Sequence, residues 1–163
     1  MITSEKRDAL LKQLQSMWSN TNNLNYVLPS LSVRTVLDMY LRLMSFPEGS
    51  EVIMSAVNIP DMCYIVRHHK LNIVSWDIGI DDVTPKMELF HALVTSRTKL
   101  VIVAHIYGKW FDVNPILDVT EKLRIPVLED CAEGIWRYFV ACMLSTLLTH
   151  AYVFNQDRYF SGF

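Results

Sequence analysis

Two short apolar runs, each ending in polar or small residues, constrain the fold of this chain more than any other feature. One lies within Val94–Gly108, the other within Ile125–Ala132, and a helical pattern separates them. This order is typical of a parallel strand, a crossover helix and the next parallel strand. Functional groups of open α/β sheets gather beyond the carboxyl ends of the strands. His105 and the pair Glu129-Asp130 follow two such ends, so they are the first candidate site residues.

The same alternation runs through most of the chain. Four apolar strands, separated by stretches with apolar residues at helical spacing, predict an α/β fold with a mainly parallel sheet. The predicted strands are Glu51–Ser55, Asn72–Asp77, Lys99–His105 and Pro126–Glu129. The predicted helices are Ser4–Trp18, Val33–Met44, Pro60–His69, Pro85–Val94 and Asn114–Leu123, with Ser30 or Ser32 as the N-cap of the second.

Composition narrows the class of protein. A chain of 163 residues suits one domain, and 51% hydrophobic with 20% charged residues is typical of a globular protein. A net charge of −2 and a pI near 6.2 give no basic surface for nucleic acid, so we expect no nucleic-acid partner. Three widely spaced cysteines argue against a disulfide framework or a zinc site. Without the apolar core of a signal peptide at the N-terminus, we expect a cytoplasmic protein.

The C-terminal part breaks the alternation. Residues 135–163 are apolar and aromatic, without Gly or Pro until the end. Ser145, Thr149 and His150 dilute this stretch, so we expect a helix of uncertain origin and consider a membrane span unlikely by composition. The predicted division is therefore an N-terminal helix and linker (1–27), an α/β domain (28–134) and this tail (135–163).

A set of short motifs in order resembles the DegT/DnrJ/EryC1/StrS family of pyridoxal-phosphate (PLP) aminotransferases. The motifs are Thr95-x-Arg97-Thr98-Lys99, His105-x-Tyr107-Gly108, and Glu129-Asp130-Cys-Ala132, and the correspondence covers about residues 28–134. The family acts largely on nucleotide-linked keto sugars. The resemblance implies part of the large domain of fold-type-I PLP enzymes, with three layers and helices on both faces of the sheet.

The resemblance also implies cofactor-binding residues. Asp130 matches the aspartate that pairs with the pyridine nitrogen of PLP, where a carboxylate keeps the ring protonated. Ser32, Arg34 and Thr35 belong to the turn at a helix N-terminus that holds the phosphate, with Val33 in place of the usual glycine. Arg34 either pairs with the phosphate or points to solvent.

Two more positions depart from the family pattern. Ile59 stands where an aromatic residue usually stacks on the ring, and a branched aliphatic side chain covers less of it. Glu133 replaces the glutamine near the phenolic oxygen, where an anion would repel a phenolate. The resemblance therefore implies PLP as cofactor, with binding that we expect to be weakened or lost.

The family's Schiff-base lysine has no counterpart here, because no lysine follows Lys122. Lys99 lies at the wrong end of its strand, and Lys109 is an ordinary loop residue on the correct side of the sheet. We therefore predict a truncated aminotransferase-like domain that is catalytically impaired, with no catalytic residue of its own. Its intact form would take an amino donor and a keto sugar and form a homodimer or heterodimer.

Other interpretations stay open from sequence alone. The chain could be a non-catalytic module that pairs with a full-length aminotransferase subunit. A doubly wound nucleotide-binding domain is disfavoured, because the sequence has no G-x-G-x-x-G or Walker loop. Asp130 could be only a loop cap, and His105 could be a hydrogen-bonded histidine at a buried strand end.

Overall fold

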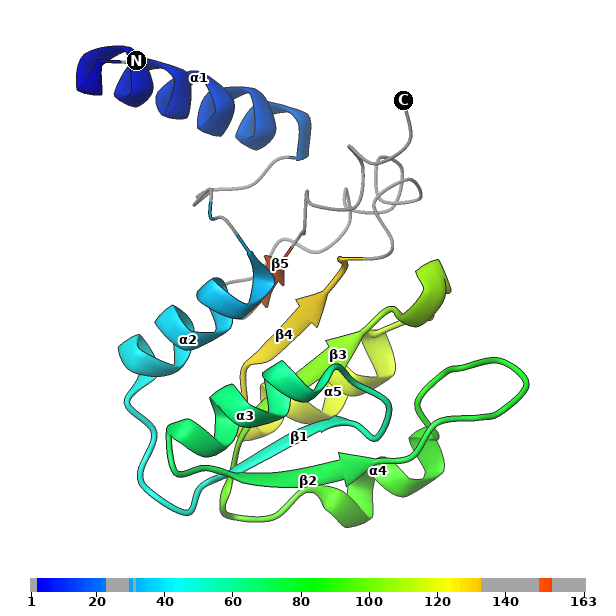
Figure 1. Ribbon diagram of the computed structural model, residues 1–163. Helices are drawn as coiled ribbons and strands as arrows, with labels where there is room; N and C mark the ends of the chain where they lie inside the picture. The colour runs from blue at the N-terminus through cyan, green and yellow to red at the C-terminus, as the bar shows by residue number, and fades with distance from the viewer. Residues whose placement is uncertain (1–2, 23–29, 31, 133–149, 154–163) are drawn as a thin grey trace.

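A five-stranded parallel sheet forms the centre of the structure, a computed structural model that describes residues 3–22, 30, 32–132 and 150–153. Every neighbouring pair of strands is parallel, which confirms the predicted α/β class with a mainly parallel sheet. Figure 1 shows the strands in the order β2 (Asn72–Trp76), β1 (Glu51–Ser55), β3 (Thr98–Ala104), β4 (Val127–Asp130) and β5 (His150–Val153).

Helices cover both faces of the sheet and make three layers, as expected (Figure 1). On one face lie α2 (Val33–Met44) and α3 (Pro60–His68), and on the other lie α4 (Met87–Leu93) and α5 (Asn114–Leu123). The handedness of the strand connections decides which face of the sheet each helix covers. The crossover β1–α3–β2 runs one way across the sheet, the crossovers to β3 and β4 run the other way, and right-handed connections then place their helices on opposite faces.

Alternating side chains of the strands build a separate core under each layer. Leu100 and Ile102 of β3 and Leu128 of β4 pack beneath α2 and α3. Val101 and Val127, one position away, pack against α4 and α5. All five are at most 2% exposed. Successive strand residues point to opposite faces, so a strand that is buried on both faces is a continuous apolar run.

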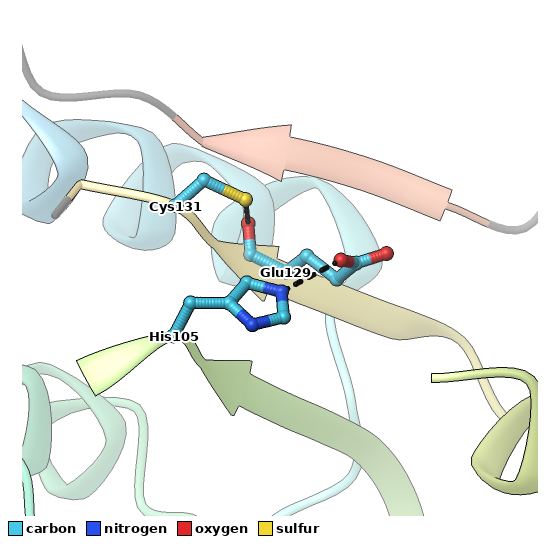
Figure 2. A group of neighbouring side chains, drawn as sticks. All are labelled: His105, Glu129 and Cys131. Atoms are coloured by element: carbon cyan, nitrogen blue, oxygen red, sulfur yellow. Dashed lines mark hydrogen bonds and ion pairs between the residues drawn. The ribbon is translucent and has the colours of Figure 1, made fainter. Parts of the chain in front are cut away.

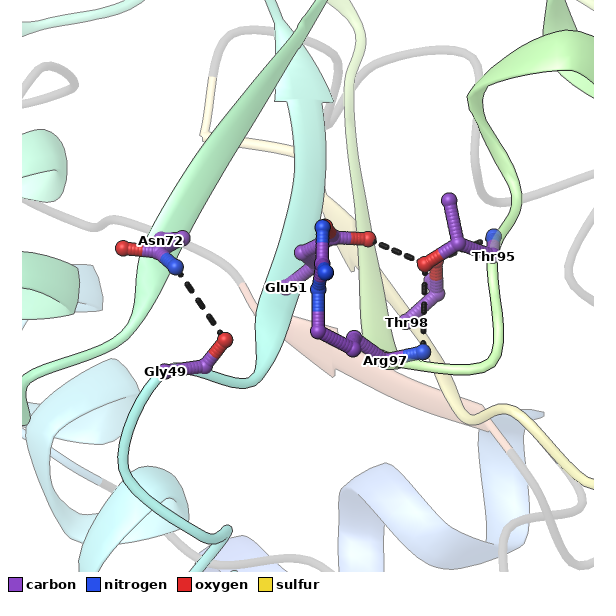
Figure 3. Close-up of polar contacts among 6 residues, drawn as sticks. All are labelled: Gly49, Glu51, Asn72, Thr95, Arg97 and Thr98. Carbon is purple, nitrogen blue, oxygen red and sulfur yellow. Dashed lines mark hydrogen bonds and ion pairs between the residues drawn. The ribbon is translucent and has the colours of Figure 1, made fainter.

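A buried carboxylate at the amino ends of the strands ties β1 to the turn before β3 (Figure 3). Glu51 accepts hydrogen bonds from the Thr95 hydroxyl and from the Arg97 guanidinium, whose Nε lies 2.9 Å from Oε1. The Glu51 N–H also donates to the Arg97 carbonyl at 2.8 Å. These contacts, that of Thr95 first, hold the pKa of Glu51 below its ordinary value. The motif around Thr95 and Arg97 is therefore a structural latch, far from the carboxyl ends.

Most predicted boundaries differ from the structure by one or two residues, but two expectations are wrong. Pro85 does not begin a helix: it pairs with Ile78 in an antiparallel bridge, and α4 starts at Met87. The helix predicted for the tail is wrong for His150–Val153, which form β5 beside β4. The rest of the tail, 133–149 and 154–163, lies outside the described residues.

The N-terminal helix α1 spans Ser4–Asn22, four residues longer than predicted. Its apolar residues Leu10, Leu11 and Met17 are exposed, and Figure 1 shows the helix away from the sheet and its two layers. Among the described helices, none combines the length and the apolar character that crossing a bilayer requires.

Candidate functional site

A pocket of about 380 Å³ opens at the carboxyl ends of the central strands. Its volume falls in the range of ligand pockets. The chain passes from β1 to β2 in one direction and reaches β3 on the other side of β1, so the strand order reverses between β1 and β3. Ligands of open α/β sheets bind at this reversal. Four segments line the pocket: the start of α2, the loop after β1, the end of β3 and the end of β4, the last two with the residues that follow them. The lining residues are Ser32, Val33, Arg34, Val57, Asn58, Ile59, Ala104, His105, Ile106, Tyr107, Asp130 and Ala132.

The N-terminus of α2 forms one end of the pocket. Ser32 is the N-cap: its Oγ accepts from the Thr35 N–H at 3.2 Å and lies 2.9 Å from the Thr35 hydroxyl. The first N–H groups of a helix lack intrahelical acceptors and carry partial positive charge, which favours an anion. Val33 packs into the core with 5% exposure, so its side chain points toward the sheet rather than to solvent. A valine in place of glycine is thereby accommodated.

Arg34 lies at the rim of the pocket. Its Nη1 is 3.4 Å from Oδ2 of Asp61 in the first turn of α3, and both side chains are about half exposed. An exposed pair of this length contributes little stability and leaves guanidinium N–H groups available to another acceptor. Arg34 thus lines the pocket and is half exposed, and its pairing with a phosphate stays a prediction.

Asp130 also lines the pocket. It is the last residue of β4, pairs in register with Ala104, and accepts the Ala132 N–H through Oδ1 at 3.0 Å. Alternation along β4 places Asp130 on the face covered by α2 and α3, the side from which Ser32 approaches. The hydrogen bond to Ala132 is the loop-capping role expected of any aspartate, and it occupies one of the two carboxylate oxygens.

The loop after β1 supplies another part of the pocket lining. Ile59 precedes α3 and is 44% exposed, as expected for a side chain that covers a ligand rather than fills the core. Asn58 accepts the Ile59 N–H through Oδ1 at 2.9 Å, while its buried Nδ2 has no hydrogen-bond partner among the described residues. A buried donor without an acceptor is costly, and a ligand oxygen in the pocket would satisfy it.

His105 and Glu129 form a buried pair (Figure 2), and alternation along β4 puts the Glu129 side chain on the face of the sheet opposite to that of Asp130. His105 Nε2 is 3.0 Å from Glu129 Oε2. The Cys131 thiol lies nearby and donates to the Glu129 carbonyl at 3.9 Å. The three ligand-type atoms lie within 4.8 Å of one another. Because the imidazole and the carboxylate hydrogen-bond to each other directly, the geometry is that of a structural pair. This favours the interpretation of His105 as a hydrogen-bonded histidine at a buried strand end.

The structure brings four of the six predicted cofactor residues to one pocket: Ser32, Arg34, Ile59 and Asp130. Thr35 is not among the lining residues, and its backbone N–H and hydroxyl contact the Ser32 N-cap instead. Glu133 lies outside the described residues. Lys109 is not in the pocket lining, because its Nζ donates to the Asp81 carbonyl at 3.2 Å. Sequence reasoning does not identify Asn58, although an asparagine between a strand and a Pro-initiated helix is a signal of a shaped loop.

The fold and the pocket define a class of α/β protein with a parallel sheet and a ligand site at its carboxyl edge. Solved structures share this fold. One is NtdA from Bacillus subtilis with bound PMP (TM-score 0.70, 24% identity), and the match covers 77% of this chain and 29% of the other. GDP-4-keto-6-deoxy-D-mannose-3-dehydratase from E. coli with hydrated PLP is also similar (TM-score 0.69, 22% identity, 76% and 33%).

Sequence comparison defines the family. The model of the DegT/DnrJ/EryC1/StrS aminotransferase family matches residues 24–139, and the chain belongs to this family. UDP-4-amino-4-deoxy-L-arabinose–oxoglutarate aminotransferase of Shewanella sediminis is 30% identical over 107 residues, 65% of this chain and 28% of the relative. GDP-perosamine synthase of Caulobacter vibrioides is 30% identical over 106 residues, 62% and 27%. The chain thus spans little more than a quarter of these relatives.

Proposed function

We propose that this chain forms the PLP-binding part of a sugar aminotransferase. The N-terminus of α2, with Ser32 as its cap and Arg34 at the rim, would hold the phosphate. Asp130 would pair with the pyridine nitrogen and keep it protonated. Ile59 would cover one face of the ring. When bound, PLP supplies an electron-accepting ring for bond cleavage next to the substrate nitrogen.

One observation carries this proposal: the α2 N-terminus and Asp130, far apart in sequence, line the same pocket. An anion-binding helix end and a carboxylate in one pocket suit a ligand that carries both a phosphate and a protonated ring nitrogen. The Nδ2 of Asn58, which has no hydrogen-bond partner among the described residues, gives the same pocket a donor for a ring substituent or a phosphate oxygen. These residues fit PLP as a group, although Val33 and Ile59 replace the residue types usual in the family.

We further propose that these 163 residues do not complete transamination by themselves. Among the described residues no lysine lines the pocket, and no lysine follows Lys122 in the sequence. A positioned amine is needed to bind the cofactor covalently and to move the substrate proton. Glu133, in the position of the usual glutamine, stays a prediction as a neighbour of the phenolic oxygen. The domain that these residues form would bind PLP reversibly.

The substrate class follows by analogy with the relatives. Their names specify amino sugars and sugar nucleotides, so a keto sugar and an amino donor are proposed for the complete enzyme. A homodimer or heterodimer would be the functional unit. A cytoplasmic setting belongs to the same proposal, since three widely spaced cysteines argue against a disulfide framework.

PLP binding by the full chain tests the function. Equilibrium dialysis should show reversible binding, and Asp130→Asn should weaken it about tenfold or more, because a charge-assisted hydrogen bond is lost. Ser32→Ala should weaken it less, since the backbone N–H groups stay. Asp118→Asn, on the exposed side of α5, is the control and should bind like the parent chain. Equal affinity of the Asp130→Asn and parent chains would contradict the proposal.

A second candidate function is a non-catalytic module that pairs with a full-length subunit. The exposed apolar residues of α1 (Leu10, Leu11 and Met17) favour it, since such a stripe usually packs against a partner. Sedimentation of the chain mixed with a full-length family member should then show a complex that Leu10→Lys disrupts. If no complex forms and the chain binds PLP, the results would support only the first proposed function.

A further inference from the structure

The buried pair His105–Glu129 is the most unusual polar feature of the described residues. Both side chains are at most 1% exposed, and Nε2 lies 3.0 Å from Oε2. The imidazole ring stacks on Trp110 at 4.1 Å between centroids and 14° between planes, and contacts Phe111 at 4.9 Å. Burying these two polar groups costs free energy that a pair of apolar side chains would not cost. A pair retained at this cost points to a positional role, which its contacts with the neighbouring strands should reveal.

The pair fastens the ends of the two strands that deliver Asp130. His105 follows β3, Glu129 lies in β4, and the register pairs Val103 with Glu129 and Ala104 with Asp130. The His105 N–H also donates to the Asp130 carbonyl at 3.1 Å. His105 thus contacts β4 twice, through its backbone at Asp130 and through its ring at Glu129. Rotation of the Asp130 peptide would have to break both contacts.

The two acidic neighbours point to opposite faces of the sheet. Glu129 lies on the α4–α5 side, where Phe111 packs, and Asp130 lies on the pocket side. A one-residue slip of β4 would exchange the two carboxylates. That slip would also place the Asp130 carboxylate opposite the imidazole, so the pair does not set the register by itself. In the observed register it anchors the Glu129 side chain on the α4–α5 side, while Asp130 stays on the pocket side.

We propose that His105 and Glu129 are positioning residues for Asp130: they fix the end of β4 so that the Asp130 carboxylate meets the ring nitrogen of PLP. This role rests on the function proposed above. A charge-assisted hydrogen bond needs a defined direction, and a small displacement of the acceptor weakens it. Ring-nitrogen recognition should thus depend on two residues that act through Asp130: Glu129 points to the other face of the sheet, and His105, although it is among the pocket-lining residues, bonds to Glu129 and to the Asp130 carbonyl.

Replacing both partners separates positioning from simple stability. In His105→Phe/Glu129→Leu, apolar side chains of similar shape replace both members of the pair, so neither is left buried opposite an apolar replacement, and the variant should fold about as stably as the parent chain. Affinity is measured by dialysis for PLP and for its analogue with C–H in place of the ring nitrogen. The parent chain should prefer PLP. The double variant should lose about tenfold of this preference, while affinity for the analogue stays within a factor of about three.

A double-mutant cycle places the effect at Asp130. If the pair acts through Asp130, adding the two apolar substitutions to Asp130→Asn should cause no further loss of preference. Glu129→Gln, which keeps a side chain that can bond to His105, should retain most of it. Glu51→Ala is the matched control. It removes another buried, hydrogen-bonded carboxylate at the opposite end of the sheet, and should lower the free energy of unfolding without changing the preference.

The outcomes are distinct. A parent chain that binds neither probe, or both equally, would refute the proposed function. A parent chain that prefers PLP, with the same preference in the folded His105→Phe/Glu129→Leu variant, would overturn the positioning role and leave the function intact. If the double variant does not fold, Glu129→Ala and Glu129→Gln give the comparison. An equal loss of the preference for PLP in Glu129→Ala and Glu129→Gln, or no loss in either variant, would also overturn the positioning role.

Discussion

At the scale of single residues, Glu51 shows how a buried charge is made tolerable. Its side chain is 7% exposed, yet a hydroxyl, a guanidinium and a neighbouring strand surround it. The bonds from Thr95 and Arg97 stabilise the ionised form and lower the pKa of Glu51. The latch at the amino ends should therefore respond to pH.

The pH dependence has a defined sign. Because the folded pKa of Glu51 lies below its ordinary value of 4.5, its contribution to stability is complete above that pH and is lost as the pH falls through the folded pKa. Glu51→Gln should cost about 1–3 kcal/mol at pH 7 and flatten the loss of stability below pH 4.5. Urea unfolding at several pH values checks this, with the exposed Glu121→Gln of α5 as control. An unchanged acid slope in Glu51→Gln would contradict the latch.

At the scale of elements, the helices differ in how well their ends suit their sequence. The start of α2 has a serine N-cap with a hydrogen bond to Thr35. The end of α5 is less suited, because Arg124 adopts the left-handed conformation with φ 54° and ψ 38°. A residue with a Cβ is strained there, and glycine is not.

Arg124→Gly should therefore stabilise the chain by about 0.5–1 kcal/mol, since relief of strain exceeds the greater flexibility of glycine in the unfolded state. Arg124→Ala removes the same side chain but keeps the Cβ, so it isolates the backbone effect and should give no gain. The midpoint of urea unfolding measures both. A larger gain from alanine than from glycine would show that the arginine side chain, not φ, limits stability.

At the scale of the whole molecule, local pattern explains most of the fold. The buried run Leu100–Val103 and the helical spacing of Val33–Met44 each determine an element, and their alternation determines the parallel class. The strand β5 was not predictable in this way, because His150–Val153 becomes a strand only by pairing with β4, and its own sequence lacks the flanking turn signals. Tertiary pairing overrides local pattern at such positions.

The residues of the candidate site also differ in how far the sequence predicts them. Ser32 and Asp130 were identified by resemblance to family motifs, and the pocket that joins them follows from strand order. Asn58 and the His105–Glu129 pair depend on register and on packing across loops, and no spacing in the sequence specifies either. Residues that bind are thus more readily predicted than residues that hold the binding residues in place.

The two-layer construction gives a final prediction, because only one layer carries the pocket. Leu37 of α2 is fully buried on the pocket side, and Leu117 of α5 is 8% exposed on the other. Each Leu→Ala change leaves a cavity, and for Leu37 the cost is about 2–5 kcal/mol. Leu37→Ala should also loosen the helix whose first turn lines the site, whereas Leu117→Ala should not.

Ligand linkage measures that difference. At a PLP concentration one hundred times the dissociation constant of the parent chain, binding should raise the free energy of unfolding by about 2.7 kcal/mol. Leu117→Ala should keep this increment although it starts from a lower stability. Leu37→Ala should show a smaller increment, because part of the binding free energy is used to order α2 again. Equal increments in the two variants would mean that binding does not depend on the order of α2, and would direct attention to Asn58, outside α2, as a phosphate ligand.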